Sequence, residues 1–224
     1  MLKSINLHIL EHIKKWNRTK MNKTIKAIPL YLISLILTNI FYYAFMIPGA
    51  LLYPGYSPFE HTVSAIGNTT RNPNGWFLFS ISLILMAIAL IPFIFDTKKW
   101  YEAQSSVKKY VIAIQIIGLF NSLSMIMIAI NPTDTASEAH GFWSLMNFLC
   151  IELVIVLAII GLRNHPSYWK RLTIIAVLDF VFCITYLVLL RAYRPIATIF
   201  EHLTFMLILG YLLLLGYNMY KEDL

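Results

Sequence analysis

The feature that most constrains the fold is a series of six long apolar runs. Each has about 20 mostly apolar residues, which is the length needed to cross a bilayer as a helix. The runs are Ala27–Ile47, Gly75–Phe95, Tyr110–Ile130, Gly141–Leu162, Leu172–Leu190 and Ile199–Tyr220. They lack the alternation of apolar and polar residues that membrane β-barrel strands show. The sequence therefore predicts an all-α fold, a polytopic membrane bundle with six transmembrane helices.

The composition agrees with a chain that is mostly membrane-embedded. Of the 224 residues, 58% are hydrophobic and 13% are charged, against about 45–50% and about 25% in soluble domains. We expect a basic cytoplasmic segment over 1–26, a six-helix domain over 27–220 and a cytoplasmic tail over 221–224. Within the first segment, helical spacing of apolar residues predicts an amphipathic helix on the inner leaflet, with a solvated tail as the alternative. Those residues are Leu2, Ile5, Ile9, Ile13 and Trp16.

The distribution of Lys and Arg predicts the orientation. The first segment, the second and fourth connections and the tail carry fifteen, whereas the other connections carry three. The positive-inside rule then places both termini in the cytoplasm, in a multi-pass protein of the cell membrane. This asymmetry also explains the net charge of +7. The expected partners are therefore membrane lipids and not nucleic acid, and a homo-oligomer is left open.

Histidines and acids gather on the predicted outer side. His61, His140 and His202 lie there near helix ends, together with Asp134. Such a set can bind zinc tetrahedrally and activate a water molecule. The candidate metal ligands are His61, His140, His202 and Asp134, and the candidate catalytic residues are Ser64, His61, Asp134 and His140. Capping and ordinary hydrogen bonding are the simpler interpretation of the same residues.

The remaining three histidines lie on the predicted cytoplasmic side. His8, His12 and His165 fall in basic connections, where we expect ordinary surface histidines.

The fourth predicted helix carries further polar residues below His140. Ser144 and Asn147 follow His140 at helical spacing, so the three residues form one polar stripe that descends into the bilayer.

Two capping boxes predict where helices begin on the outer side. Ser57 and Glu60 predict a short extracytoplasmic helix over Pro58–Ile66, in the first outer loop, which ends at Gly67. Thr135 and Glu138 predict that the fourth helix begins near Ala136.

Acidic residues also lie within the apolar runs. Glu152 and Asp179 are predicted at one depth near the midplane, on sequential helices that we expect to be neighbours, with Asn39 and Asn121 at similar depth. Acids inside a membrane mark proton or ion pathways by default. These four residues are therefore a candidate proton or cation relay, and neutral acids that hydrogen-bond between helices are the alternative. The cysteines, Cys150 and Cys183, are expected to be reduced residues of the core.

Three outer motifs resemble those of a prokaryotic membrane family catalogued as domain of unknown function 998. They read YPGYSPFEHTVSAIGNTTRNPNGW from Tyr53, NPTDTASEAHG from Asn131 and TIFEHLTF from Thr198. The resemblance implies six spans but no activity. It marks as motif positions Pro54, Gly55, Tyr56, Ser64, Gly67, Asp134, His140 and Gly141. The last motif has Glu201-His202 where Gln-Arg-like residues are typical of that family.

Three functions fit these residues. The leading one is a polar outer site that binds a lipid headgroup or a small amphiphile, without catalysis and without a cofactor. The second is a metal-dependent lipid hydrolase that uses zinc at the histidine cluster. The third is a proton- or cation-coupled transporter that uses Glu152 and Asp179.

Overall fold

The computed structural model describes residues 27–222, and the regular structure of this part of the chain is helical throughout. The predicted amphipathic segment, with His8 and His12, lies outside the described residues. The long helices are α2 (Leu30–Leu51), α3 (Trp76–Asp96), α5 (Lys108–Ile130), α6 (Ser137–Leu162), α7 (Arg171–Ala192) and α8 (Arg194–Lys221). Three short elements join them, the 3₁₀ helices η1 (Val63–Gly67) and η2 (Ser105–Val107) and the α-helix α4 (Lys99–Ala103). Six of these helical segments are long and apolar enough to cross a membrane, which confirms the predicted bundle.

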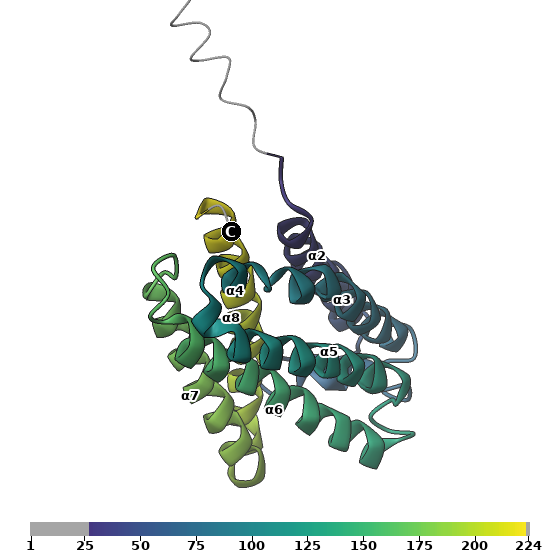
Figure 1. The fold of residues 1–224 in the computed structure, drawn as a ribbon. Coiled ribbons are helices and arrows are strands. Elements are labelled where there is room, and N and C mark those ends of the chain that lie inside the picture. The colour runs from purple at the N-terminus through teal and green to yellow at the C-terminus, as the bar shows by residue number, and fades with distance from the viewer. Residues whose placement is uncertain (1–26, 223–224) are drawn as a thin grey trace, which may run out of the picture.

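The helices pack as an antiparallel bundle (Figure 1). The closest pairs are α2 with α3, α5 with α6 and α7 with α8, while α3–α5 and α2–α8 contacts join the pairs. By contrast, α6 and α7 touch over a small area, so they are weaker neighbours than expected. We call the end with connections 52–75 and 131–136 the long-loop end. The opposite end, with connections 97–107 and 163–170, we call the basic end.

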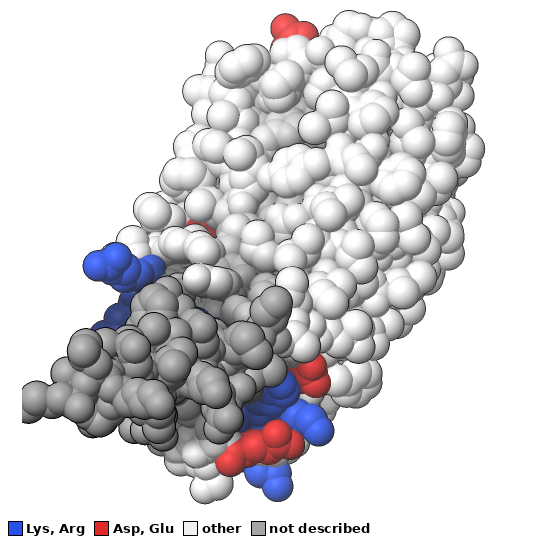
Figure 2. Space-filling model, turned by 90° about the horizontal axis from the view of Figure 1, so that it is seen from above, with Lys and Arg blue, Asp and Glu red and all other residues white. Residues whose placement is uncertain are grey.

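The outside of the bundle suits a lipid environment. Many large apolar side chains are exposed on the outward faces of the helices, among them Ile116, Ile174 and Val188. Figure 2 shows one broad surface with few charged side chains, and Lys and Arg gathered at one end of it. The chain is therefore a multi-pass membrane protein, because such a surface is stable only where apolar side chains meet lipid.

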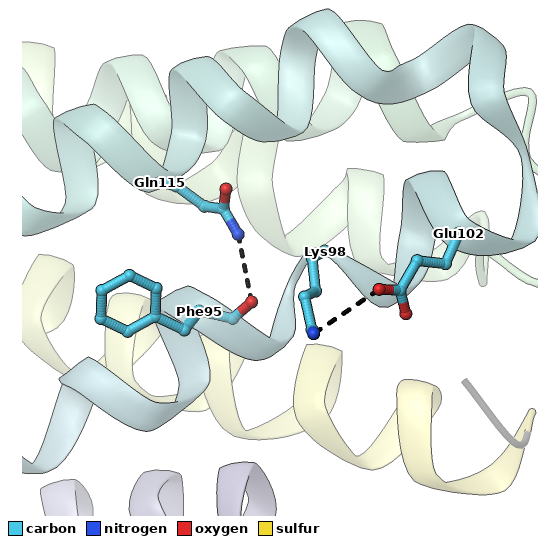
Figure 3. A network of polar contacts seen from close by, with 4 residues as sticks. All are labelled: Phe95, Lys98, Glu102 and Gln115. Carbon is cyan, nitrogen blue, oxygen red and sulfur yellow. Dashed lines mark hydrogen bonds and ion pairs between the residues drawn. The ribbon is translucent and has the colours of Figure 1, made fainter.

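Polar contacts fix the junction between α3, α4 and α5 at the basic end (Figure 3). Gln115 of α5 donates a hydrogen bond to the carbonyl oxygen of Phe95 at 3.1 Å. That carbonyl belongs to the last turn of α3. Lys98 and Glu102, four residues apart, form an exposed ion pair at 3.6 Å. Such a pair contributes little stability, and the hydrogen bond from Gln115, which is also exposed, is the contact that joins α5 to α3.

The helix boundaries at the long-loop end differ from the predictions in two places. The predicted helix over 58–66 is wrong in extent. The carbonyl of Ser57 accepts hydrogen bonds from the N–H groups of Glu60 and His61, which closes a single turn. Thr62 is then extended, and η1 begins only at Val63. The α2 helix also continues through Pro48, to Leu51.

The start of α6 near Ala136 is confirmed, but the capping box is not. Ala136 itself is the cap residue, and no side chain hydrogen-bonds to the cap. Thr135 lies one residue too early to act as the cap, which explains why its pairing with Glu138 does not form.

A close approach of α5 and α6 gives a test of this packing. A Cβ atom at Gly161 would lie 2.6 Å from Cβ of Tyr110, whereas one at Gly210 of α8 would meet nothing within 4 Å. We expect Gly161→Ala to destabilise the protein by about 1–3 kcal/mol, because it forces the helices apart. Gly210→Ala is the control and should leave the melting temperature nearly unchanged. Equal melting temperatures for the two variants would contradict this close packing.

Candidate functional site

The long first connection folds as a fixed scaffold over the long-loop end. Asn72 is fully buried and donates two hydrogen bonds, to the carbonyl oxygens of Gly49 (3.0 Å) and Ile66 (2.8 Å). Gly55 has φ +72°, a conformation that favours glycine. A Cβ atom at Gly67 would lie 2.5 Å from the ring of Phe79. Two of the three glycine motif positions therefore have a structural reason, whereas a Cβ atom at Gly141 would meet nothing within 4 Å.

Asp134 ties the two long connections together. Its carboxylate accepts hydrogen bonds from the backbone N–H groups of Thr69 (3.1 Å) and Thr70 (2.8 Å). It also accepts from the hydroxyls of Thr69 (2.8 Å) and Thr70 (2.7 Å). Its slight burial opposes ionisation, but the four hydrogen bonds outweigh that effect and hold the pKa of this carboxyl well below its usual range. The predicted catalytic or metal residue is thus engaged as a link between loops.

The hydrogen bonds of Asp134 predict that the stability difference between the wild type and Asp134→Asn depends on pH. Asp134→Asn should lower stability at pH 7 by about 1–2 kcal/mol, a modest loss because the site is exposed. Since the folded-state pKa lies below the unfolded value of about 3.9, the stabilisation is present above that pH and is lost as the pH falls through the folded-state pKa. Melting temperatures of the two proteins should therefore differ at pH 7 and converge in strong acid. A gap that widens in acid would contradict the link.

His140 lies in the first turn of α6 and is buried. Its Nδ1 atom is 2.7 Å from the carbonyl oxygen of Asn131, so Nδ1–H donates that bond. Its Nε2 atom is buried without a hydrogen-bond partner. The hydrogen bond to Asn131 joins the first turn of α6 to the C-cap residue of α5.

A second cluster forms where the first connection meets α8. Nε2 of His202 lies 3.2 Å from the hydroxyl of Tyr56 and 3.2 Å from the carbonyl oxygen of His61. The ring of Tyr56 stacks on His61 at a centroid distance of 5.5 Å. Oε2 of Glu201, a buried residue, accepts a hydrogen bond from the N–H of Val63 at 3.1 Å. Burial and the nearby Glu201 raise the pKa of Tyr56 far above its usual value, so Tyr56 stays protonated.

The structure does not gather the predicted metal ligands at one point. His61 and His202 share the Tyr56 cluster, whereas His140 contacts Asn131 and Asp134 contacts the two threonines. Among residues 27–222, no group of three or more His, Cys, Asp or Glu side chains is placed to hold a metal ion.

A cavity lies directly below this cluster, with about 450 Å³ of space between atoms, part of which is open to solvent. Its polar lining comes from η1, α6, α7 and α8, and it includes Ser64 and Ser144. Phe205 and Tyr186 are among its aromatic lining residues. The polar residues of the lining are Ser64, Ser144, Asn147, Tyr186 and Glu201. Ser144 and Asn147 thus continue the predicted polar stripe into the bundle, while His140 is not among the lining residues. We call this space the mouth cavity.

Three further cavities, with about 450, 380 and 360 Å³ of space between atoms on the same definition, follow the mouth cavity along the bundle. Consecutive cavities share lining residues. Leu83, Asn147 and Phe205 line both the mouth cavity and the second. Leu212 of α8 lines the second, third and fourth, and the fourth reaches Trp100 at the basic end. The linings of these three are mainly aliphatic and aromatic, so the series is polar at one end and apolar along its length. We call the four cavities together the channel.

The four predicted relay residues lie at three separate places. Glu152 and Asp179 are both buried, and they interact electrostatically across the small contact between α6 and α7. Asn121 instead donates a hydrogen bond to the carbonyl oxygen of Asn147 at 3.0 Å and lines the channel. Asn39 bonds within its own helix, to the carbonyl oxygen of Leu35.

His165 is not a surface histidine, so that prediction is wrong. It is 4% exposed, and its ring meets Trp100 edge-on at a centroid distance of 4.9 Å. Burial lowers the pKa of this imidazole, although a backbone contact to Trp100 partly opposes the shift. Connection 163–170 packs against Trp100 of α4. The number of Lys and Arg residues in a connection does not reveal such a contact.

These observations define a class of protein: a six-helix membrane bundle with a row of small internal cavities, the most polar of which lies under a structured loop. Residues 36–218 match the family described as "Protein of unknown function (DUF998)", and the chain belongs to that family. No curated protein and no solved structure matches the chain.

Proposed function

We propose that this protein binds a single-chain amphiphile, with its polar head in the mouth cavity and its apolar chain in the rest of the channel. The observation that carries the proposal is the change from polar to apolar lining along a series of adjacent cavities. Apolar walls with a few convergent polar groups are typical of small-molecule sites. The walls come from α3, α5, α6 and α8, so the chain of the ligand lies inside the bundle, away from bulk lipid.

The lining of the mouth cavity selects the chemistry of the head. Hydroxyls of Ser64 and Ser144 and the amide of Asn147 donate and accept hydrogen bonds. None of the described lining residues is Lys or Arg, and Glu201 adds an acidic group. Among the described lining residues, an anionic head would meet no compensating positive charge. The mouth therefore favours an uncharged, hydroxyl-bearing head such as that of a monoacylglycerol.

Two probes with the same acyl chain test this preference. We expect purified full-length protein to retain 1-oleoylglycerol in native mass spectrometry and to retain oleate at least about tenfold less well, a difference of about 1.4 kcal/mol. Ser144→Ala and Asn147→Leu should reduce the preference, because they remove hydrogen-bonding groups from the mouth. Equal retention of both probes would show that the head is not recognised, and retention of neither would contradict binding itself.

We further propose that the long-loop end faces away from the cytoplasm and that residues 1–26 form a cytoplasmic segment before the six-helix domain. The Lys and Arg asymmetry supports this orientation. In a variant without the two native cysteines, a cysteine at Asn68 should react with an impermeant thiol reagent added to intact cells. A cysteine at Lys98 should react only after the membrane is opened. The reverse pattern would overturn the orientation and move the mouth to the cytoplasmic side.

A further inference from the structure

We propose that Glu152 and Asp179 form a buried proton-binding site that exchanges with the basic end of the bundle through Tyr211 and Tyr168. The acid pair is separate from the channel, since neither acid lines the cavities described above, whereas Tyr211 of the route lines the fourth cavity. Proton binding by the pair therefore does not depend on the proposed binding of an amphiphile.

The first observation is that two acids are enclosed together without partners. Glu152 is 7% exposed and Asp179 is 0% exposed. None of their four carboxyl oxygens has a hydrogen bond of normal geometry, although the thiol of Cys183 lies close enough to Glu152 to interact with it. An ionised carboxylate inside a membrane is costly without a partner. Two adjacent carboxylates repel each other in addition. A proton on the pair removes the repulsion and supplies an O–H donor between the acids.

The second observation is a pair of buried phenols beside the acids. Tyr211 of α8 is 0% exposed, and its hydroxyl has no hydrogen-bond partner of normal geometry. It interacts electrostatically with Asp179 and lies beside the hydroxyl of Tyr168. Tyr168, in connection 163–170, is also buried without a partner for its hydroxyl. The two hydroxyls thus extend from the acids toward the basic end.

The surrounding groups favour a proton over a metal cation. The groups that act on the pair are the thiol of Cys183 on α7 and the phenol of Tyr211 on α8, with Tyr168 behind it. Hard cations such as Ca²⁺ take six to eight oxygen ligands, and two carboxyl groups do not supply them. A single proton needs only one acid to hold it and the other to accept its hydrogen bond.

The exchange step conserves atoms and charge. A proton that arrives at the basic end adds to the oxygen of Tyr168, which releases its own hydrogen to Tyr211. Tyr211 releases its hydrogen in turn to the carboxylate of Asp179, so both phenols return to the neutral form. The acid pair gains one proton and loses one negative charge. Release follows the same steps in reverse.

Gain or loss of this proton is expected to change helix packing, because the acid pair lies between α6 and α7. The α6 and α7 helices meet over a small area, whereas α7 packs extensively on α8. Glu152 of α6 interacts with Asp179 and Cys183 of α7 across that area. Loss of the proton would place two negative charges in that area and loosen the α7–α8 pair from the other helices. The site is thus suited to link pH to the packing of this pair.

Infrared spectroscopy of the full chain in dioleoylphosphatidylcholine vesicles tests the proposal. We expect the carbonyl band of a protonated carboxylic acid at pH 7, lost or shifted in Glu152→Gln and in Asp179→Asn. Glu60→Gln, at an exposed acid, is the control and should leave the band unchanged. A wild-type protein without this band at pH 7, or with the same band in both variants, would overturn the site. The wild-type spectrum decides even if a variant fails to fold.

The proposed proton route through Tyr168 and Tyr211 is tested by the rate at which the acid pair exchanges its proton for deuterium. After transfer to D₂O, the band should shift severalfold more slowly in Tyr168→Phe and in Tyr211→Phe than in the wild type. Tyr217→Phe, at an exposed tyrosine of α8, is the matched control and should exchange at the wild-type rate. Unchanged rates in both buried-tyrosine variants would overturn the route.

Discussion

Leu212→Trp is expected to weaken binding of 1-oleoylglycerol by at least about tenfold, which corresponds to about 1.4 kcal/mol. Leu212 lines three consecutive cavities of the channel, so a larger ring there fills the space that the acyl chain would occupy. Retention by native mass spectrometry measures the change. The loss should be greater for long chains than for short ones, because a short chain would end before the obstruction.

Leu214→Trp is the matched control for this experiment. Leu214 lies two residues further along α8 and is 38% exposed on the lipid-facing side. The same substitution there adds the same aromatic ring to the same helix but leaves the channel open. Unaltered binding in Leu212→Trp, with a normal melting temperature, would mean that the acyl chain does not occupy the channel.

Asn72→Ala is expected to destabilise the protein by about 2–4 kcal/mol, the largest effect that we predict for the first connection. The substitution leaves the carbonyl oxygens of Gly49 and Ile66 without the amide that donates to both. Each buried polar group left without a partner costs about 1–3 kcal/mol. Thermal unfolding of purified protein measures the loss.

Asn68→Ala makes the same change in the same connection and serves as the control. Asn68 accepts one hydrogen bond, from the N–H of Arg71 at 2.7 Å, in an exposed turn. Water can replace that bond, so the loss should stay below about 1 kcal/mol. If Asn68→Ala proved as damaging as Asn72→Ala, burial of the Asn72 amide would not be the cause.

Much of the fold could be predicted because its signal is local. A run of apolar residues such as the one ending at Leu162 specifies a spanning helix without reference to any other segment. The 3₁₀ helix at Val63 was missed because the apparent capping box at Ser57 closes only one turn before the chain extends at Thr62. The buried position of His165 depends on Trp100, far away in the sequence.

The site was less predictable because it depends on helix rotation. Spacing correctly indicated that Ser144 and Asn147 follow one face of α6, and both line the mouth cavity. The same spacing could not show that His140 turns to Asn131 or that Asp134 binds two threonines. Nor did it reveal Phe205 and Leu212, because apolar residues that line a channel look the same in sequence as those that face lipid.

The most direct test of the central claim is to map where an amphiphile lies in the folded protein. A monoacylglycerol with a photoreactive diazirine at the end of its chain can be cross-linked to the full-length protein in vesicles, and mass spectrometry can identify the labelled residues. We predict labels on residues that line the channel, such as Ile151 and Leu209, which are 8% and 2% exposed. These labels should disappear in Leu212→Trp and persist in Leu214→Trp. Labels confined to lipid-facing residues such as Ile116, equal in both variants, would contradict the claim.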